Sequence, residues 1–347
     1  MLSQPSRPPR SRSRSRSGSR AALLVFLTAL PAFSACGSFQ DPSIVVDLRI
    51  LAAVTEPPEQ VVPFDPQDPT EIPDFQPFDL CALVADPGVD RGLSWSLSVC
   101  PQKLDLRCDP DRPSFVAATG HIDDPDSSAT PQQLCATVPA GGPLLGVLRD
   151  AIEHDSLAGF GGIDLNLALT VTPDGAPDQA VYGAKAARFS AKLPAERVAN
   201  SNPTLDRIDV DLPAGGDPVP LPLGRCVDQP SPLSISVGQR IHLTPVEPPG
   251  ARETYVVPTF EGGSRTFTEN LRYQWLAGDG DWTRASTGGT RDAAGNEPPL
   301  DTEWKTPTAA QLADRGISLP LDVPLWVIQR DERGGAAWFE SCIRVVP

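Results

Sequence analysis

Residues that carry out chemistry in many enzymes are scarce in this sequence. Its 347 residues include three histidines, His121, His154 and His242. The serine-hydrolase elbow G-x-S-x-G, the zinc-protease pair H-E-x-x-H and the phosphate-binding P-loop are absent. His154 ends a predicted helix and His242 alternates with apolar residues on a predicted strand, toward solvent, so both have ordinary structural explanations. We expect no enzymatic activity, and a hydrolase that uses His121 or a carboxylate is the less favoured alternative.

Patterns for metal binding are missing as well. There is no C-x-x-C pair and no zinc-type spacing of Cys and His, so we expect no bound metal or other cofactor. Two short acidic loops offer oxygens of the kind that Ca²⁺ prefers: Asp279 and Asp281 in one, and Asp123, Asp124 and Asp126 in the other. Neither loop completes an EF-hand pattern, and solvated turns are the preferred interpretation of both.

The proline content excludes long helices. The chain has 40 prolines, and each interior proline removes a helical hydrogen bond and clashes with the preceding turn. Hydrophobic residues nevertheless make up 40% of the chain, enough to build a core. Many short strands joined by Pro/Gly turns are the expected result.

The N-terminal segment is typical of an export signal. Residues 1–20 contain six arginines and no acidic residue, and the uncharged run AALLVFLTALPAFSA follows directly before Cys36. This run has 15 residues, fewer than the ~20 that span a bilayer as a helix. The Arg-Ser run at Ser11–Arg16 resembles RNA-processing proteins, but it borders an apolar segment and lacks a basic body.

Phe33-Ser34-Ala35-Cys36 resembles the lipobox of bacterial lipoproteins, although the family usually has Leu where this chain has Phe33. The resemblance implies a signal peptide at 1–35 and a mature chain that begins with a diacylglyceryl Cys36, followed by a tether at 36–44. Two or three acyl chains anchor a protein stably in a membrane. Gly37 after the cysteine fits the sorting of such lipoproteins to the outer membrane. Ordinary secretion is the alternative.

The body of the chain is strongly acidic. The net charge is −15, and removing the six N-terminal arginines leaves −21 for residues 36–347. Nucleic acid and anionic lipid both reward Lys and Arg, so we expect no nucleic-acid partner and no direct adsorption to lipid.

The cysteine count supports export. Assigning Cys36 to lipid leaves six of the seven cysteines: Cys81, Cys100, Cys108, Cys135, Cys226 and Cys342. An even number in an exported chain predicts up to three disulfides. Four lie before residue 140 and two after residue 220, so each half of the chain can pair its own, and the connectivity among the first four stays open.

Alternating apolar residues predict strands throughout the mature chain. In residues 45–193 the expected strands begin with Val46, Leu48 and Ile50, continue at 78–84, 93–99 and 163–171, and end with a hairpin partner at 180–193. Residues 63–77 are expected to form a loop, and residues 101–133 a long insertion pinned by a disulfide. One helix is expected at 142–157. A linker at 194–204 then leads to a second half at 205–347. Its expected strands lie at 208–212, 240–244, 271–276, 325–329 and 337–346, with a short helix capped by Thr306 that ends near Gly316.

This organisation resembles tandem immunoglobulin-like β-sandwich domains of bacterial surface proteins. The Val-Gly-Gln opening of the strand at 240–244, Trp275 on a middle strand and the final hairpin carry the likeness. It implies an all-β fold with two such domains, at 45–193 with a helical insertion and at 205–347. A bridge from Cys226 to Cys342 would differ from that of antibody domains. The opening Asp47–Ala52, followed by Glu56-Pro57-Pro58, also resembles uncharacterised lipoproteins of GC-rich soil bacteria, and implies no function.

Tryptophans gather in the second half. Trp275 and one of the pair Trp326 and Trp338 are expected in the core, whereas Trp282 and Trp304 lie on loop-like segments and are expected at the surface, where they could stack on sugars or anchor a partner. We therefore predict an outer-membrane lipoprotein that serves as a non-enzymatic structural or recognition module for envelope proteins. A glycan-binding surface module using Trp282 and Trp304 is the alternative.

Overall fold

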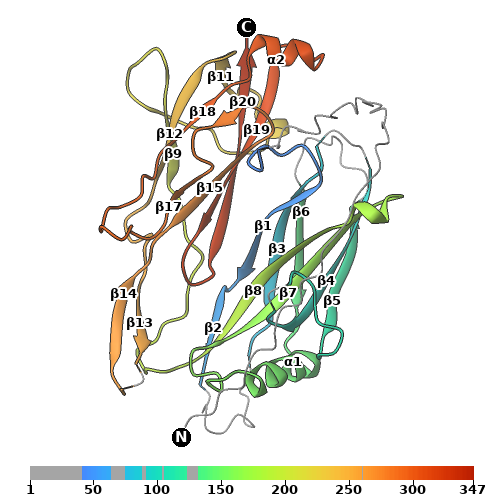
Figure 1. The fold of residues 1–347 in the computed structure, drawn as a ribbon, viewed down its shortest axis with the longest axis vertical. Coiled ribbons are helices and arrows are strands. Elements are labelled where there is room, and N and C mark those ends of the chain that lie inside the picture. Colours follow the sequence, from blue (N-terminus) through green and yellow to red (C-terminus); the bar gives the residue numbers. More distant parts are fainter. Residues whose placement is uncertain (1–40, 64–74, 88–90, 104, 123–131, 260) are drawn as a thin grey trace, which may run out of the picture. The chain divides into compact units, whose positions relative to one another are not determined.

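The computed structural model describes residues 41–63, 75–87, 91–103, 105–122, 132–259 and 261–347 (Figure 1). The predicted signal peptide, Cys36 with most of its tether, much of the predicted loop at 63–77 and the acidic loop at Asp123, Asp124 and Asp126 lie outside these residues. No helix within the described ranges is long and apolar enough to cross a membrane.

The first half contains a five-stranded and a three-stranded sheet. In spatial order the larger sheet consists of β2 (Glu59–Val62), β8 (Val181–Ala191), β7 (Ile163–Pro173), β4 (Leu93–Pro101) and β5 (Phe115–Ile122). The smaller consists of β1 (Arg49–Glu56), β3 (Phe78–Ala85) and β6 (Gln132–Val138). Helix α1 (Gly142–Glu153) contributes buried side chains such as Leu144 and Leu148 to the core that both sheets share. A one-turn helix, η1 (Pro177–Gln179), joins β7 to β8.

The second half contains two five-stranded sheets. One consists of β10 (Val219–Pro220), β9 (Arg207–Asp211), β12 (Arg240–Val246), β18 (Thr302–Lys305) and β16 (Asp281–Trp282). The other consists of β11 (Leu233–Ser236), β20 (Ala336–Val346), β19 (Leu321–Arg330), β15 (Arg272–Ala277) and β17 (Ser286–Gly288). The remaining elements are the hairpin of β13 (Thr254–Pro258) and β14 (Ser264–Thr268), the one-turn helix η2 (Cys226–Asp228) and helix α2 (Ala309–Asp314).

The predicted fold class is confirmed. The chain is mainly β, each half is sandwich-like, and helix α1 is an insertion between strands of the first half (Figure 1). The core of the second half lies between its two sheets and includes Tyr273, Trp275 and Trp304, all 0% exposed. Trp326 is buried too, whereas Trp338 is only partly buried, so the expectation for the core tryptophans is met.

Among the elements that differ from the prediction are β5, α2 and β1. Residues 115–122, expected within a loop insertion, form the edge strand β5, which pairs antiparallel with β4. Helix α2 is capped by Thr308 and not by Thr306, because Thr308 and Gln311 form a capping box while the Thr306 hydroxyl donates to Ser236 O. Strand β1 begins at Arg49, and Val46, expected to point inward, is 40% exposed.

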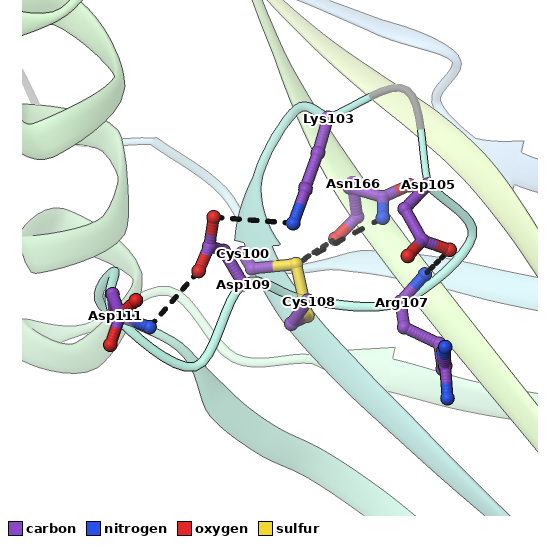
Figure 2. The surroundings of a disulfide bond; sticks show 8 residues. All are labelled: Cys100, Lys103, Asp105, Arg107, Cys108, Asp109, Asp111 and Asn166. Atoms are coloured by element: carbon purple, nitrogen blue, oxygen red, sulfur yellow. Dashed lines mark hydrogen bonds and ion pairs between the residues drawn. A yellow bond between two sulfur atoms is a disulfide. The ribbon is translucent and has the colours of Figure 1, made fainter.

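Three disulfides join all six cysteines of the described residues: Cys81–Cys135, Cys100–Cys108 and Cys226–Cys342. The first links neighbouring strands β3 and β6, and the third links η2 to β20. The second closes a short loop after β4, where Asn166 of β7 lies against Cys100 and Lys103 pairs with Asp109 at 3.2 Å (Figure 2). Each half thus pairs its own cysteines. Three disulfides are typical of a protein that folds outside the cytoplasm.

An apolar junction cluster joins the two halves. It combines residues of the first half with residues of β15 and β19: Val45, Leu51, Ala52, Leu83, Ala85, Leu276, Trp326 and Ile328. Backbone hydrogen bonds extend the contact, since Val45 N donates to Ala277 O at 2.8 Å and Ala277 N donates to Ser43 O at 3.0 Å.

Candidate functional site

A buried carboxylate, Glu59 at the start of β2, is the centre of a charged junction cluster formed by Glu59, Arg197 and Arg333. The Glu59 side chain is 0% exposed. Arg197 Nη2 donates to Glu59 Oε1 at 2.7 Å, and Arg333 Nη2 donates to Glu59 Oε2 at 2.7 Å. The Ser190 hydroxyl and the Asn200 backbone N–H donate to the same carboxylate at 2.6 and 2.9 Å. A buried charge requires this degree of pairing to be tolerated.

The surroundings of Glu59 favour its ionised form. Burial opposes ionisation, but the hydrogen bonds from Ser190, Arg197 and Asn200 and the charge of Arg197 outweigh it, so that the pKa of Glu59 lies below its ordinary value. The carboxylate is therefore a fixed negative charge inside the protein at neutral pH.

Arg333 connects three parts of the molecule. It lies in the turn between β19 and β20, and besides Glu59 it contacts Glu253 Oε2 at 3.2 Å and Glu269 Oε1 at 3.4 Å, at the base of the β13–β14 hairpin. Its guanidinium carbon lies 4.8 Å from the ring centre of Tyr255 on β13. A cation over an aromatic face is attractive. Arg333 therefore fixes the hairpin against both halves.

Glu269 responds to this environment in the opposite way to Glu59. Its side chain is 2% exposed, and burial, together with the charge of Asp331, raises its pKa to about 7. The hairpin base thus contains a carboxyl group that titrates near neutral pH.

The predicted linker at 194–204 contributes to this region. Besides Arg197, Asn200 donates through Nδ2 to Asp331 at 2.9 Å, and the Ala336 backbone N–H donates to Asn202 Oδ1 at 2.9 Å. The segment therefore contacts strands of both halves.

A cavity of about 360 Å³ opens beside the charged junction cluster. Its lining includes Tyr255–Pro258 of β13 and the turn that carries Leu157 and Phe160. Arg188, Arg197 and Arg333 line it together with Glu332. We call this space the junction groove. It combines apolar walls with charged groups, as ligand and peptide sites commonly do.

The β13–β14 hairpin extends beyond the two sheets of the second half as a two-stranded ribbon (Figure 1). Tyr255 and Phe267 face each other across its strands, with ring centres 5.7 Å apart. Phe267 is 44% exposed and Val257 is 38% exposed. Exposed apolar side chains gathered on one element are typical of interaction surfaces.

The prediction that Trp282 and Trp304 lie at the surface is wrong. Trp282 is 9% exposed and Trp304 is 0% exposed. The segments that look like loops contain the short strands β16 and β18, which pair Trp282 with Trp304 directly, with ring centres 6.3 Å apart. Both rings therefore pack in the sandwich core, and neither presents a face on which a sugar could stack.

The three histidines lie at three separate places. Asp174 contacts His121 Nε2 at 2.8 Å and accepts from the Ser94 hydroxyl at 3.3 Å, so the carboxylate lies between hydroxyl and imidazole, unlike the order in a serine-hydrolase triad. His154 caps α1, and His242, which is partly exposed, lies between Asp211 and Asp301.

The acidic turn at Asp279 and Asp281 is occupied by structural contacts. Asp279 pairs with Arg315 at 2.6 Å, and the Trp304 indole donates to Asp279 O at 3.1 Å. Gly280 has φ +92°, and a side chain there would lie 2.6 Å from Lys305 O. Among the residues that the structure describes, no group of three or more His, Cys, Asp or Glu side chains is placed to hold a metal.

Sequence reasoning missed the charged junction cluster. Glu59 follows a Pro-Pro pair at a predicted strand end, and Arg333 lies in a predicted hairpin turn 274 positions later, so neither residue stands out. The one available signal is the placement of these charged residues at the ends of strands in both halves. That signal does not identify which charged residues pair with each other.

No protein-family model and no curated protein matches the sequence. Among solved structures, the chain is similar to red sea bream transglutaminase (8% identity, TM-score 0.20), covering 87% of this chain and 32% of that one. It is also similar to Escherichia coli alpha-2-macroglobulin (10% identity, TM-score 0.22), covering 89% of this chain and 22% of that one. A third similar structure is the B domain of a biofilm associated protein (8% identity, TM-score 0.25), with 88% of each chain covered. The chain thus spans about a third of the length of the transglutaminase. At TM-scores of 0.20 to 0.25, these likenesses are distant.

Proposed function

We propose that this protein is a recognition module of the bacterial cell envelope, without catalytic activity, tethered to the outer membrane through a lipid on Cys36. The export signal and the lipobox-like sequence support the tether, and the three disulfides support an oxidising compartment. The partner that fits best is another envelope protein.

The observation that carries the proposal is the junction groove with the hairpin beside it. Arg333 contacts both Glu59 of the charged junction cluster and Glu253 next to β13, so ion pairs hold the β13 side of the groove in place. Apolar side chains remain exposed on the hairpin next to it. A preorganised surface of this kind binds with a small loss of conformational freedom.

Photo-crosslinking on intact cells tests the recognition role. A photoreactive amino acid is placed at Val257, which is 38% exposed on β13, and for comparison at Val227, which is 61% exposed on η2. We expect a discrete protein adduct from position 257 that is absent from position 227, identified by mass spectrometry. Equal labelling at both positions, or no adduct at 257, would contradict the proposal.

The tether is tested separately. Mass spectrometry of the mature N-terminal peptide should find a diacylglyceryl Cys36, and Cys36→Ser should move the protein from the membrane fraction to the soluble fraction. An unmodified Cys36, or a mature chain that begins elsewhere, would contradict the anchor and leave the recognition role to be judged by the crosslinking.

A further inference from the structure

Strand β13 has one edge that pairs with no other strand in the described part of the chain. Its partner on the other edge is β14. Hydrogen bonds from Glu269 N to Glu253 O (3.0 Å) and from Thr259 N to Gly263 O (2.9 Å) flank the hairpin and set its register. Antiparallel pairs alternate between bonded and non-bonded, so the N–H and C=O of Thr254 and Val256 point away from β14.

The free edge of β13 borders the junction groove. Four consecutive residues, Tyr255–Pro258, line the groove. Successive side chains of a strand point to opposite faces, so a space that touches four residues in a row lies along the edge of the strand. Pro258, which has no N–H, stands at an outward position, as proline does on edge strands.

An apolar wall from the first half also lines the groove. Leu157 and Phe160 supply it, and Leu157 is 47% exposed. The volume of about 360 Å³ suits one or two medium-sized side chains and not a folded domain.

Arginines outnumber carboxylates among the residues that line the groove, and each arginine is paired with at least one carboxylate. Three arginines and one glutamate line it, and the glutamate, Glu332, accepts a hydrogen bond from Asn270 at 2.8 Å. Arg197 uses Nη2 for Glu59 and Ser190, whereas its Nε and Nη1 make no hydrogen bond within the described residues. Arg188 pairs with Asp164 at 3.1 Å and is 31% exposed. Arg188 is thus paired with Asp164, and Arg333 with Glu59, Glu253 and Glu269, so the donors that the groove offers to a carboxylate are Nε and Nη1 of Arg197.

We propose that the junction groove binds an extended, acidic segment of a partner protein, which adds to the free edge of β13 as a third strand. Backbone hydrogen bonds to Val256 and Thr254 give affinity that does not depend on sequence. An apolar side chain of the segment packs against Leu157, and a carboxylate of the segment binds Arg197, which selects acidic sequences. This inference rests on the proposed recognition role and names the chemistry of its partner.

A matched pair of proline variants of the full chain tests which edge is used. Val256 and Thr266 are directly opposite each other in a non-bonded pair, so both backbone N–H groups point out of the hairpin, at opposite edges. Val256→Pro and Thr266→Pro therefore remove equivalent groups and leave the bonds between β13 and β14 intact. Circular dichroism and the melting temperature confirm that both variants fold.

The probe is the fluorescein-labelled peptide Ser-Thr-Val-Thr-Glu-Val-Thr-Ser, with forms in which Gln or Lys replaces Glu, and the measurement is fluorescence anisotropy. We expect saturable binding of the Glu peptide, about tenfold weaker binding of the Gln form and none of the Lys form. Val256→Pro should weaken binding about tenfold or more, and Thr266→Pro should change it less than about twofold.

Three results would overturn the inference: no binding of the Glu peptide, equal binding of the Glu and Lys peptides, or equal loss in both proline variants. Sedimentation that shows a dimer abolished by Val256→Pro would also overturn it, because a second copy would then occupy the edge. If cells yield an adduct at position 257 but the peptide tests fail, the recognition role stands and the strand-addition inference falls. If the peptide binds as expected but cells yield no adduct, strand addition stands and the recognition role on cells falls.

Discussion

The two halves of this protein meet through two contacts of different character. The apolar junction cluster, with Leu83, Trp326 and Ile328, buries side chains that need no particular partner. The charged junction cluster around Glu59 depends on hydrogen bonds of defined length and direction. The first contact contributes free energy in proportion to the area buried. The second adds little net free energy, because desolvation offsets the attraction, but it fixes which groups meet.

The directional character of the charged contact explains how ion pairs can orient the β13–β14 hairpin. The β13–β14 ribbon shares no sheet with the rest of the second half, so strand pairing does not orient it. Arg333, which contacts Glu253, Glu269 and Tyr255, supplies the orientation. We infer that the apolar cluster sets how strongly the halves associate and that the charged cluster sets the shape of the groove.

Breaking the charged cluster should have the largest effect. Arg333→Met removes one of the two arginines that hydrogen-bond to Glu59 and removes the cation from Glu253 and Glu269, so we expect the free energy of unfolding to fall by about 3 to 5 kcal/mol. Urea denaturation measures it. Arg344→Met, which breaks an exposed pair with Asp322, is the control and should cost less than about 1 kcal/mol. Adding Glu59→Gln to Arg333→Met should restore part of the loss; a further fall would refute the buried-charge explanation.

Truncating the apolar cluster should destabilise the protein without moving the hairpin. Leu83, 0% exposed, faces the second half, and Leu83→Ala should cost about 2 to 5 kcal/mol. Val116→Ala, at a residue 59% exposed, should cost less than about 0.5 kcal/mol. Native-state hydrogen exchange separates the two contacts: amides of β13 and β14 should exchange faster in Arg333→Met and not in Leu83→Ala. Equal acceleration in both variants would argue against the division of roles.

The titration of Glu269 offers a pH test of the same region. Its pKa of about 7 in the folded protein lies above the ordinary 4.5, so the folded state binds the proton more tightly. The stability it contributes is complete below pH 4.5 and is lost as the pH rises through 7. Glu269→Gln should therefore be more stable than the parent at pH 8, by up to about 3 kcal/mol, and similar at pH 4.5. Glu261→Gln, at an exposed turn, should show no such difference.

The smallest effect should come from an exposed charged group. The hydrogen bond to Asp301 raises the pKa of His242, so its stabilising contribution is present below pH 6.5 and is lost as the pH rises above its folded value. The imidazole is 38% exposed, and solvent screening limits the effect. His242→Gln should lower the free energy of unfolding by less than about 1 kcal/mol at pH 5.5 and leave it unchanged at pH 8. If His242→Gln lowered the free energy of unfolding as much as Arg333→Met does, the expected difference between buried and exposed charges would be contradicted.

Much of the fold could be predicted because alternation is a local property. Residues 93–99 and 163–171 alternate clearly and form β4 and β7, and the apolar face of the expected helix became the buried face of α1. Strands β16 and β18 escaped prediction because two to four residues carry no readable period. Trp282 and Trp304 were misplaced for that reason.

By itself the sequence determined the all-β class, the positions of the longer strands and an even set of six cysteines, because each follows from composition or from neighbours along the chain. The tertiary structure alone decided the disulfide partners in the first half, the burial of the tryptophans and the meeting of Glu59 with Arg333. These depend on which strands lie side by side, and contacts between residues 274 positions apart leave no periodic trace in the chain. The groove on which the proposed function rests belongs to this second group.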